Sequence, residues 1–532
     1  MRIPVRRALK DVLGQIPLTA ETYWMLRQRG QPISGFALRQ TAARLPAWVS
    51  EAQEAAQHAP QGKRVCIFAT LHYWIAHTTG VGLALAGLGH EVSLAYLPYR
   101  QWRQRVPRFD LRRSDTYARW VLRRAMPMLR PVSLLRERRA SLPPALAEAI
   151  AQVSAYDVQY TLQVETVDTQ SPLYRLRLER NTLAAEALLA RWQRRRPDVV
   201  IIPNGMILEF GAAFQTARFL DIPAVTYEFG EQRERVWLDW NRPVMWQDTT
   251  SLWEAVRDRP LTEGQWQQVR ELFAARRGGR LWANFSRQWQ QTASAGGEKA
   301  RAALGLDERP IFLLPTNVLG DSLVLGREVF SQSLAEWLRE TVRYFARHPE
   351  AQLVIRIHPG ERLTQGPSLA EAVRQALPHL PEHIHLVAAD DPLNTYDLME
   401  IASAGLVFTT TVGLEMAMSG LPVVVAGKTH YRNRGFTLDP DSWASYYQWL
   451  DRLLAQPSRY RLSEAQTRLA WKYAYHFFFD YPRPFPWHVV YQNEDMTRWP
   501  LKRALAEPKF QETFAALTSG RLPWEEAPGE KA

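Results

Sequence analysis

The stretch from 407 to 427, VFTTTVGLEMAMSGLPVVVAG, constrains the fold more than any other part of this 532-residue chain. Its pattern predicts the end of a buried strand, a threonine-rich turn, a short helix that stops at Gly420, and the next strand. The hydroxyls of Thr409, Thr410 and Thr411 are expected where the helix leaves its first amide groups unpaired. The stretch therefore predicts an α/β unit with an anion-binding helix start.

Glu415 belongs to the same short helix and has two interpretations. If Thr411 is the N-cap, Glu415 is the fourth helical residue, which is too late for a capping box. Its carboxylate could simply complement the helix dipole, or it could accept hydrogen bonds from the ribose diol of a bound nucleotide. The threonines could equally be ordinary cap and turn residues. The rest of the sequence has to decide between these interpretations.

Length and composition indicate a folded globular protein of two or three domains. The charged fraction is 23%, and no run of about eighteen apolar residues occurs. The basic start of the sequence is not followed by the apolar core of a signal peptide, so we expect a cytoplasmic protein. The single cysteine, Cys66, lies in an apolar strand pattern and can form neither an intrachain disulfide nor a thiolate metal site.

Arginine carries most of the net charge of +12, and much of it falls between residues 100 and 140. Apolar residues stand between these arginines, which predicts a basic amphipathic region. Such a surface could contact an anionic membrane, an acidic glycan or nucleic acid, or it could be a solvated face. Nucleic acid is not expected, because the chain shows no zinc-finger spacing, no RNA-binding aromatic signature and no helix-turn-helix. The arginines are Arg100, Arg103, Arg105, Arg108, Arg112, Arg113, Arg119, Arg123, Arg124, Arg130, Arg136, Arg138 and Arg139.

Alternating strand and helix patterns predict a parallel α/β sheet in the first half. Residues 64–72, 89–96, 198–205 and 224–230 are interpreted as strands with their exit loops, and 156–164 alternates like a further strand. Parallel sheets bind ligands at the carboxyl ends of their strands, so residues of the exit loops are candidates for a cleft. These candidates are His72, His77, Asn204, Gly205, Glu209 and Glu228.

Glu228 is the candidate catalytic group of this half. It ends a buried strand, where desolvation would raise its pKa toward the range useful for a general base. A structural ion pair with Arg233 or Arg235 is the alternative. His72 and His77 would contact substrate if they faced the cleft, although a lone histidine in such a place is more often structural.

The second half repeats the α/β pattern. A strand over 310–315 is followed by the exit loop 316–322, and another strand runs from 352 to 358. In that strand, side-chain alternation places Arg356 and His358 on one face at the carboxyl end. The two groups together suit a phosphate or a carboxylate, and a buried ion pair is the alternative.

Several motifs together resemble the capsular polysaccharide synthesis family. Thr-Thr-Thr-Val-Gly-Leu-Glu-Met-Ala at 409–417, followed by Gly-Leu-Pro-Val-Val at 420–424, resembles the hallmark segment of that family. The His-Pro pair at 358–359 resembles its His-Pro motif, and 317–322 is similar to its Gly-Asp-Ser loop. Glu-Phe-Gly at 228–230 resembles an acidic-x-Gly element of its first domain.

This resemblance implies a glycosyltransferase in which sugar transfer occurs between two domains. His358, Thr410 and Thr411 would hold the donor phosphate, often that of CMP-Kdo, and Glu415 would lie near the ribose. Members that transfer Kdo tend to have two acidic residues before the glycine, whereas this chain has Phe229 in the second place. The candidate residues are Glu228 as catalytic base; Arg356, His358, Thr409, Thr410, Thr411 and Glu415 for the donor; and His72, His77, Asn204, Gly205, Asp321 and Ser322 for the acceptor or cleft.

The expected architecture is α/β of the GT-B type, with two Rossmann-like domains facing a cleft and C-terminal helices crossing back. Residues 1–60 are interpreted as a peripheral helical segment. The acceptor domain is placed at 61–295, with an Arg-rich helical insertion at about 100–140. The nucleotide-donor domain is placed at 300–460, and 461–532 is assigned to C-terminal helices and a tail.

The expected reaction is transfer of a sugar from a CMP-Kdo-like or other nucleotide-activated donor to a surface or capsular polysaccharide or a glycolipid. The nucleotide-sugar is a substrate, and neither a cofactor nor a metal ion is expected. The spacing Asp439-Pro-Asp441 is interpreted as a turn. The enzyme would be cytoplasmic, and the Arg-rich region could hold it at the inner face of an anionic membrane.

Two other classes of function remain open from the sequence. One is a related enzyme, either a nucleotide-sugar epimerase or a polyol-phosphate transferase. The other is a scaffold that binds a glycan or a membrane without turnover.

Overall fold

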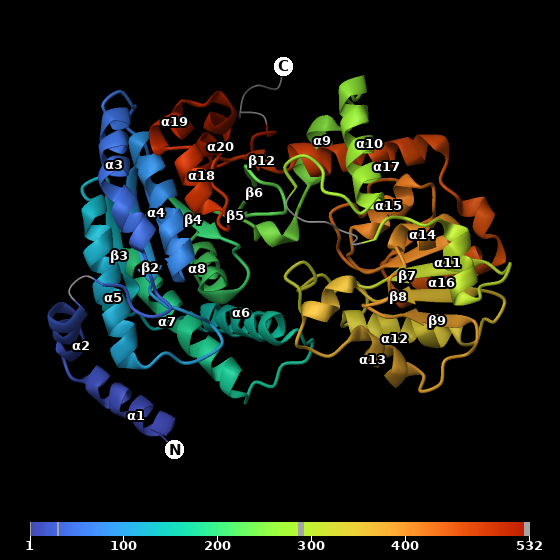
Figure 1. Cartoon of the computed structure of the whole chain (residues 1–532), viewed down its shortest axis with the longest axis horizontal. Coiled ribbons are helices and arrows are strands. Elements are labelled where there is room, and N and C mark those ends of the chain that lie inside the picture. Colours follow the sequence, from blue (N-terminus) through green and yellow to red (C-terminus); the bar gives the residue numbers. More distant parts are fainter. Residues whose placement is uncertain (1, 29–30, 286–291, 526–532) are drawn as a thin grey trace.

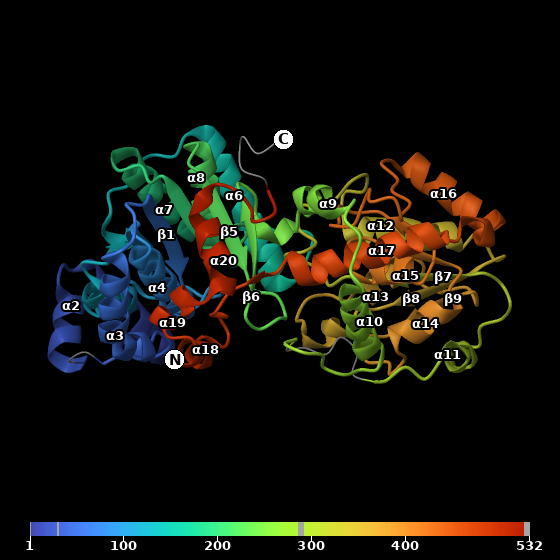
Figure 2. The same ribbon diagram turned by 90° about the horizontal axis from the view of Figure 1, so that it is seen from above.

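Two α/β domains lie side by side in the computed structural model, which describes residues 2–28, 31–285 and 292–525 (Figures 1 and 2). Each domain is built on its own sheet, and the strands of both sheets are mainly parallel. The predicted α/β fold with two Rossmann-like domains is therefore confirmed. None of the helices in the described ranges combines the length and the apolar character needed to span a membrane.

The first domain has a seven-stranded sheet of order β12-β6-β5-β4-β1-β2-β3. Its central strands β1 and β4 are buried beyond Arg64 because helices cover both faces of the sheet. The parallel strands are β1 (Arg64–Thr70), β2 (Glu91–Leu97), β3 (Leu129–Ser133), β4 (Val199–Pro203) and β5 (Ala224–Glu228). At one edge, β6 (Arg235–Trp240) and β12 (Arg483–Pro484) are antiparallel.

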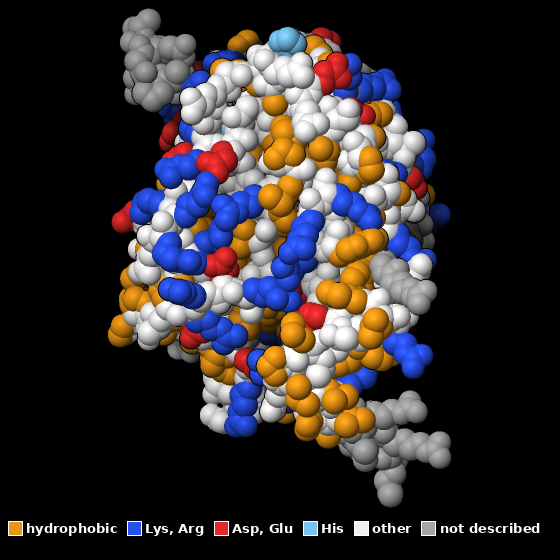
Figure 3. Space-filling model, turned by 90° about the vertical axis from the view of Figure 1, so that its left-hand side faces the viewer, with side chains coloured by type: hydrophobic (Ala, Val, Ile, Leu, Met, Phe, Trp, Pro, Cys, Tyr) orange, Lys and Arg blue, Asp and Glu red, His pale blue; other side chains and the backbone are white. Residues whose placement is uncertain are grey.

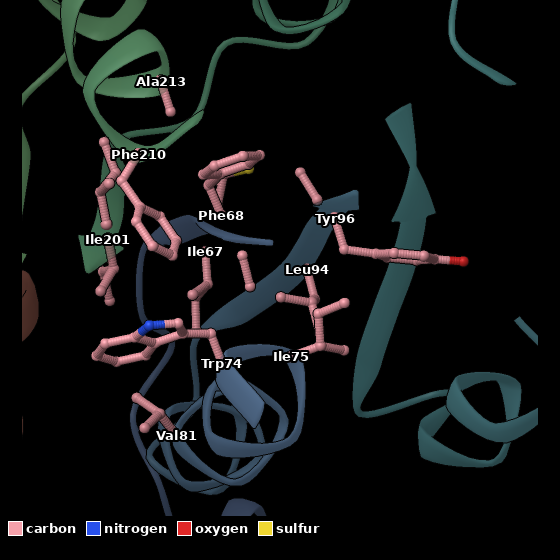
Figure 4. Close-up of a cluster of buried hydrophobic side chains, with 14 of the residues drawn as sticks. Ile67, Phe68, Trp74, Ile75, Val81, Leu94, Tyr96, Ile201, Phe210 and Ala213 are labelled. Carbon is pink, nitrogen blue, oxygen red and sulfur yellow. The ribbon is translucent and has the colours of Figure 1, made fainter. Parts of the chain in front are cut away.

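Figure 4 shows how the core of this domain is assembled. Trp74 and Val81 of α4 (His72–Gly87) approach the strands from one side, and Phe210 of α8 (Leu208–Phe219) approaches from the other. Ile67 of β1 lies between them and is fully buried. The other helices of the domain are α5 (Arg108–Leu122), α6 (Pro144–Leu162) and α7 (Pro172–Arg194), with short helical turns η2 (Arg123–Ala125) and η3 (Leu134–Arg136).

The N-terminal segment is only partly peripheral. Helix α1 (Arg2–Gln15), α2 (Thr19–Tyr23) and the turn η1 (Trp24–Gln28) lie along α5 at the outer end of the domain (Figure 1). Helix α3 (Arg39–Ala56) instead packs on α4 and buries Leu45, Trp48 and Ala52 in the core. The prediction of a wholly peripheral 1–60 segment is wrong for α3.

The predicted strand at 156–164 is wrong, because residues 156–162 form the last turns of α6 and Gln163 is its C-cap. The buried residues of α6 recur every three or four positions, which is the helical period. Three of the buried positions, Ser154, Asp157 and Thr161, are polar and interrupt the apolar pattern that would have revealed the helix.

The second domain has a five-stranded parallel sheet of order β11-β10-β7-β8-β9. Its strands are β7 (Ile311–Pro315), β8 (Gln352–Arg356), β9 (Ile384–Val387), β10 (Ala404–Val407) and β11 (Val423–Val425). Its helices are α11 (Gly297–Leu304), α12 (Leu334–Phe345), α13 (Leu369–Ala376), α14 (Thr395–Ile401), α15 (Val412–Met418), α16 (Trp443–Ala455) and α17 (Glu464–Tyr475), with turns η5 (Pro359–Leu363), η6 (Pro457–Tyr460) and η7 (His476–Asp480).

Two helices assigned to the first domain belong to the core of the second. Leu252 of α9 (Thr250–Val256) and Val269 of α10 (Glu263–Arg277) are buried in one apolar cluster with residues of β7, β10 and α17. The chain thus enters the second domain just after the turn η4 (Val244–Trp246) rather than near residue 300.

The C-terminal part crosses back to the first domain, as predicted. After η7 the chain adds β12 to the edge of the first sheet by pairing with β6. Helices α18 (Gln492–Arg498), α19 (Leu501–Ala506) and α20 (Pro508–Ser519) then pack on that domain (Figure 1). Helix α17, which was placed with them, packs on the second domain.

The Arg-rich stretch is not a separate helical insertion. It contains α5, η2 and β3, which are parts of the first domain. Many of its arginines pair with carboxylates: Arg112 lies 2.6 Å from Glu21, and Arg136 lies 2.7 Å from Asp115. Their charges are consequently neutralised within the fold.

Candidate functional site

The threonine turn and α15 form as predicted at the carboxyl end of β10. Thr411 is the N-cap residue, but its side chain makes no capping hydrogen bond. Thr409, Thr410 and Thr411 all line a cavity between the domains. The hydroxyl of Thr409 is buried and has no hydrogen-bond partner among the described residues. The turn therefore retains hydrogen-bonding capacity next to a cavity.

Gly413 allows a buried tyrosine to hold this turn. The hydroxyl of the fully buried Tyr431 donates to the carbonyl of Thr410 at 2.6 Å. A Cβ atom at position 413 would collide with that hydroxyl. The glycine of the motif is thus explained by packing rather than by backbone flexibility.

The exit of β7 connects the loops that follow its two neighbouring strands. The hydroxyl of Thr316 accepts from the backbone N–H of His358 at 3.0 Å. The side-chain carbonyl of Asn317 accepts from the backbone N–H of Thr409 at 3.2 Å. Because β7 is central in the sheet, two adjacent residues fix both the His-Pro segment and the threonine turn.

His358 has a defined tautomer in its neutral form. The backbone N–H of Gly360 donates to Nδ1 at 2.9 Å, so Nδ1 is an acceptor and Nε2 carries the proton. His358 lines two adjoining cavities. Its ring can therefore present an N–H donor to an anion without taking up a proton.

Arg356 lines one of these cavities but is mainly occupied by the protein. Its guanidinium donates to the backbone carbonyls of Ala388, Asp391 and Leu393. These bonds hold the loop after β9 against the cavity. In the structure Arg356 therefore positions this loop. The sequence had suggested instead that Arg356 contacts the nucleotide-sugar directly.

Glu415 forms a buried ion pair that the sequence did not predict. Its carboxylate lies 2.6 Å from the guanidinium of Arg276 on α10, and both side chains are about 5% exposed or less. Both residues line the same cavity as His358. A ligand in this cavity would meet a paired carboxylate and guanidinium.

Two adjoining cavities therefore meet at His358 and Arg276. One, of about 550 Å³, lies at the carboxyl ends of the strands of the second sheet. The other, of about 410 Å³, lies between the domains and is lined by the threonine turn and by first-domain residues. The first-domain residues that line it include Gln163, Gly230, Glu231, Gln232, Arg235 and Trp237.

Glu228 ends β5, two residues before Gly230 of this cleft, and its side chain is half-buried. Asn204 donates a hydrogen bond to its Oε2 at 3.1 Å, and the N–H of Phe229 donates to its Oε1 at 3.0 Å. Burial raises the pKa of Glu228 to about 7 despite these two hydrogen bonds, which lower it. The structure thus unites the predicted residues Asn204 and Glu228.

The alternative structural role for Glu228 is wrong. Arg233 pairs with Glu494, and Arg235 donates to the carbonyl of Pro482. In the described part of the chain, Glu228 has no ion-pair partner.

Tyr160 connects Glu228 with the predicted cleft residue Asp321. Burial raises the pKa of Tyr160, and the carboxylates of Asp321 and Glu228 raise it further. Asp321, Ser322 and Tyr160 line a cavity of about 300 Å³ beside the interdomain cavity. Acidic groups from both domains therefore act on one hydroxyl in the cleft.

His77 is a core residue, so its predicted cleft role is wrong. It is fully buried, its Nε2 donates to the carbonyl of Trp487 at 3.0 Å, and its Nδ1 lies 3.2 Å from the hydroxyl of Tyr227. Burial lowers its pKa to about 4, so it stays neutral near pH 7. His72 begins α4, packs edge-on against Phe36, and lines none of the three cavities at the cleft.

Gly205 and Glu209 also have structural roles. Gly205 has a φ of 80°, and a Cβ there would collide with Thr226, so it shapes the turn that positions Asn204. Glu209, expected at the sheet edge, is buried in a charge cluster with Arg177, which also binds Asp157.

Arg276 and Tyr160 are site residues that sequence reasoning missed. Arg276 lies on a helix assigned to the other domain, and its partner Glu415 follows far along the chain. Tyr160 was placed in a strand. A helical interpretation of 144–162 would have indicated that Tyr156 and Tyr160, four residues apart, share a face. Within the described ranges, no group of three or more His, Cys, Asp or Glu side chains is arranged to hold a metal ion.

The fold and this cleft define a two-domain α/β protein of the GT-B type. Residues 282–475 match the family model described as capsule polysaccharide biosynthesis protein. This match covers most of the second domain, and it confirms the resemblance predicted from the motifs there. A search of curated proteins gives no match.

Several solved structures are distantly similar. KpsC of Thermosulfurimonas dismutans, described as a beta Kdo 2,4 transferase, is 16% identical over 52% of this chain and 78% of its own, with a TM-score of 0.34. A beta Kdo 2,7 transferase KpsC from the same organism is 14% identical over 54% and 79%, with a TM-score of 0.31. UDP-GlcNAc 2-epimerase from Neisseria meningitidis is 12% identical over 79% and 99%, with a TM-score of 0.24.

Proposed function

We propose that the protein is a cytoplasmic glycosyltransferase that moves a sugar from a nucleotide-activated donor to a polysaccharide or glycolipid acceptor. The observation that carries this proposal is Glu228, a half-buried carboxylate with a pKa of about 7 and no cationic partner in the described residues. It stands two residues before Gly230, which lines the cleft together with the threonine turn and His358 of the other domain. In this proposal the first domain supplies the base, and the second domain supplies the anion site.

The nucleotide would occupy the 550 Å³ cavity of the second domain. There, the Nε2–H of His358 and the hydroxyls of the threonine turn would contact the phosphate, and Glu415 would accept from the ribose while still paired with Arg276. A CMP-Kdo-like donor is the first candidate, and other nucleotide-sugars fit the same chemistry. In this proposal the protein's own donors stabilise the departing phosphate, without a metal ion or another cofactor.

The proposed reaction is a displacement at the anomeric carbon. Glu228 removes the proton of an acceptor hydroxyl as its oxygen bonds to that carbon. The bond from the anomeric carbon to the phosphate oxygen breaks, and the phosphate keeps the electron pair. The protonated Glu228 then returns its proton to water. Because the base must be ionised, the rate should rise with pH through about 7.

The test combines binding and turnover. Isothermal titration with CMP-, UDP- and GDP-linked sugars should reveal a donor whose binding is weakened about tenfold or more by His358→Ala. Glu228→Gln should keep donor binding and lower transfer to a glycan acceptor by about 100-fold or more. Absence of any binding that depends on His358 would refute the donor site. Conversion of the donor into an epimeric nucleotide-sugar without an acceptor would instead identify an epimerase.

A further inference from the structure

The outer end of the first domain exposes an apolar patch that the proposed reaction does not use. We define this N-terminal patch as Leu9, Val12, Ile16, Leu18, Met25 and Leu26, whose side chains are 47–69% exposed. Of the sixteen large apolar side chains exposed in the described part of the chain, nine lie within residues 9–26 or 120–126. Figure 3 views the molecule from this end and shows orange apolar side chains gathered on the lower part of the face.

Helix α1 carries part of this patch on a single face. Leu9 and Val12 are three residues apart in α1, so they point to the same side of the helix, and Ile16 follows directly after its last residue, Gln15. The opposite side contacts α5 closely, because a Cβ at Gly14 would collide with the backbone of residues 108 and 109. The apolar face therefore points away from the domain, contrary to the usual inward orientation of an amphipathic helix.

The acidic side chains around the patch are turned inward. Glu21, Asp110 and Asp115 are at most 11% exposed, and each is paired with a nearby arginine. Asp11 is 24% exposed and faces Arg105. The carboxylates of this end of the domain thus present little negative charge to the outside.

Cations without an acidic partner stand next to the patch. Arg27, Arg123 and Arg124 are exposed, and none has an ion-pair partner in the described ranges. The guanidinium of Arg124 lies over the ring of Trp120 at 3.9 Å, which joins a cation to an exposed aromatic side chain. In Figure 3, blue side chains lie beside the orange ones on this face.

We propose that this end of the first domain docks on an anionic lipid bilayer. Leu9, Val12 and Ile16 would enter the headgroup boundary with α1 parallel to the surface, and the unpaired arginines would contact lipid phosphates. The charge pattern favours a membrane over a second copy of this chain, because a two-fold interface would bring these arginines together. The cations involved differ from Arg112, Arg113 and Arg136, which the protein itself neutralises.

Vesicle co-sedimentation of the full chain tests this inference. The protein should bind phosphatidylcholine vesicles that contain phosphatidylglycerol and bind pure phosphatidylcholine much more weakly. Leu18→Ser/Leu26→Ser should weaken binding about tenfold or more. Arg123→Gln/Arg124→Gln should weaken it by a similar factor and reduce its dependence on salt.

Matched variants elsewhere on the surface serve as controls. Leu281→Ser/Val490→Ser removes two exposed apolar side chains, and Arg459→Gln/Arg461→Gln removes two exposed arginines outside the patch. Both should bind vesicles as the parent does. Equal weakening by the controls, or no binding of the parent to anionic vesicles, overturns the proposal. The proposal is also overturned if the parent is a dimer that does not bind vesicles and Leu18→Ser/Leu26→Ser makes it a monomer, because the patch would then be an interface between two copies of the chain. Donor titrations of the patch variants, expected to be unchanged, separate this result from the proposed reaction.

Discussion

Asn204 donates one of the two hydrogen bonds that lower the pKa of Glu228; the N–H of Phe229 donates the other. Its backbone is left-handed, with a φ of 58°, and its side-chain carbonyl accepts from the N–H groups of Met206 and Ile207. The amide group is thereby turned so that its N–H donates to Glu228. Because that bond stabilises the charged carboxylate, it keeps the pKa lower than burial alone would set it.

Asn204→Gly should therefore move the pH dependence of transfer. Glycine tolerates the left-handed backbone, so the main effect is loss of the amide. The pKa of Glu228 should rise, the ionised fraction at pH 7 should fall, and the rising limb of kcat/KM should shift to higher pH. A loss of about tenfold at pH 7 is expected from one hydrogen bond to a charged group.

Asn241→Gly is the matched control for this experiment. Asn241 has the same φ of 58°, but its side chain accepts from the N–H of Ala224 rather than contacting Glu228. Its pH profile should match that of the parent. The same shift in both variants would show that the effect comes from backbone loosening.

At the scale of elements, the end of α6 reaches across to the second domain. Both carboxylate oxygens of Glu165 accept from the N–H of Ala335, at 3.1 and 3.2 Å, in the first turn of α12. Gln163 accepts from the N–H of Gln365 at 3.0 Å. A carboxylate of one domain thus binds an N–H in the first turn of a helix of the other, beside that helix's own N-cap Ser333, and complements the helix dipole.

Glu165→Ala should loosen the contact between the domains. Loss of this hydrogen bond between the domains costs about 1 kcal/mol, so open forms should become about fivefold more populated. Small-angle scattering of the ligand-free protein should then give a larger radius of gyration than the parent. Asp168→Ala removes an exposed carboxylate a few residues away and should leave the scattering unchanged. An unchanged radius of gyration in Glu165→Ala would show that this hydrogen bond does not hold the two domains together.

The elements that the sequence predicted correctly are those whose chemistry is local. The buried strands are apolar runs, and the turn, α15 and Gly420 follow local rules, so the outline of the second domain could be predicted. Helix α6 was missed because Asp157 lies at a buried position, where it binds Arg177. The spacing of apolar residues along the sequence cannot reveal an ion-pair partner twenty residues away.

Residue roles were harder to predict than element positions. The alternation of side chains along β8 correctly predicted that Arg356 lies at the cavity wall. It could not show that the guanidinium donates hydrogen bonds to three backbone carbonyls. Likewise, Glu415 was placed correctly in α15, while its partner Arg276 comes from a distant helix. Such roles depend on packing between elements, which no local pattern encodes.

At the scale of the whole molecule, the C-terminal segment completes the first domain. Trp487 is 2% exposed, its indole N–H donates to the carbonyl of Trp499, and its own carbonyl accepts from His77. The same apolar cluster contains Phe485, Phe514 and residues of β1 and α4. The core of the domain is thus assembled from both ends of the chain.

Trp487→Ala should destabilise the first domain selectively, by about 3–5 kcal/mol. Hydrogen exchange should rise in β1, α4 and β6 and stay unchanged in the second sheet. Trp337→Ala, at a fully buried position in the second domain, should give the reverse pattern. Equal exchange in both domains after either change would mean that they unfold as a single unit.

The return of the chain also sets an order of events during synthesis. A ribosome that has translated through η7 has made every strand of the second sheet, whereas the first sheet still lacks β12 and the helices that follow it. Domains usually fold in the order in which they are made. Here the later domain can finish first, and the earlier one waits with an open sheet edge and a partly uncovered core. The nascent protein should depend most on chaperones in this interval, and stalling or truncation before α18 should leave an aggregation-prone first domain attached to a folded second one.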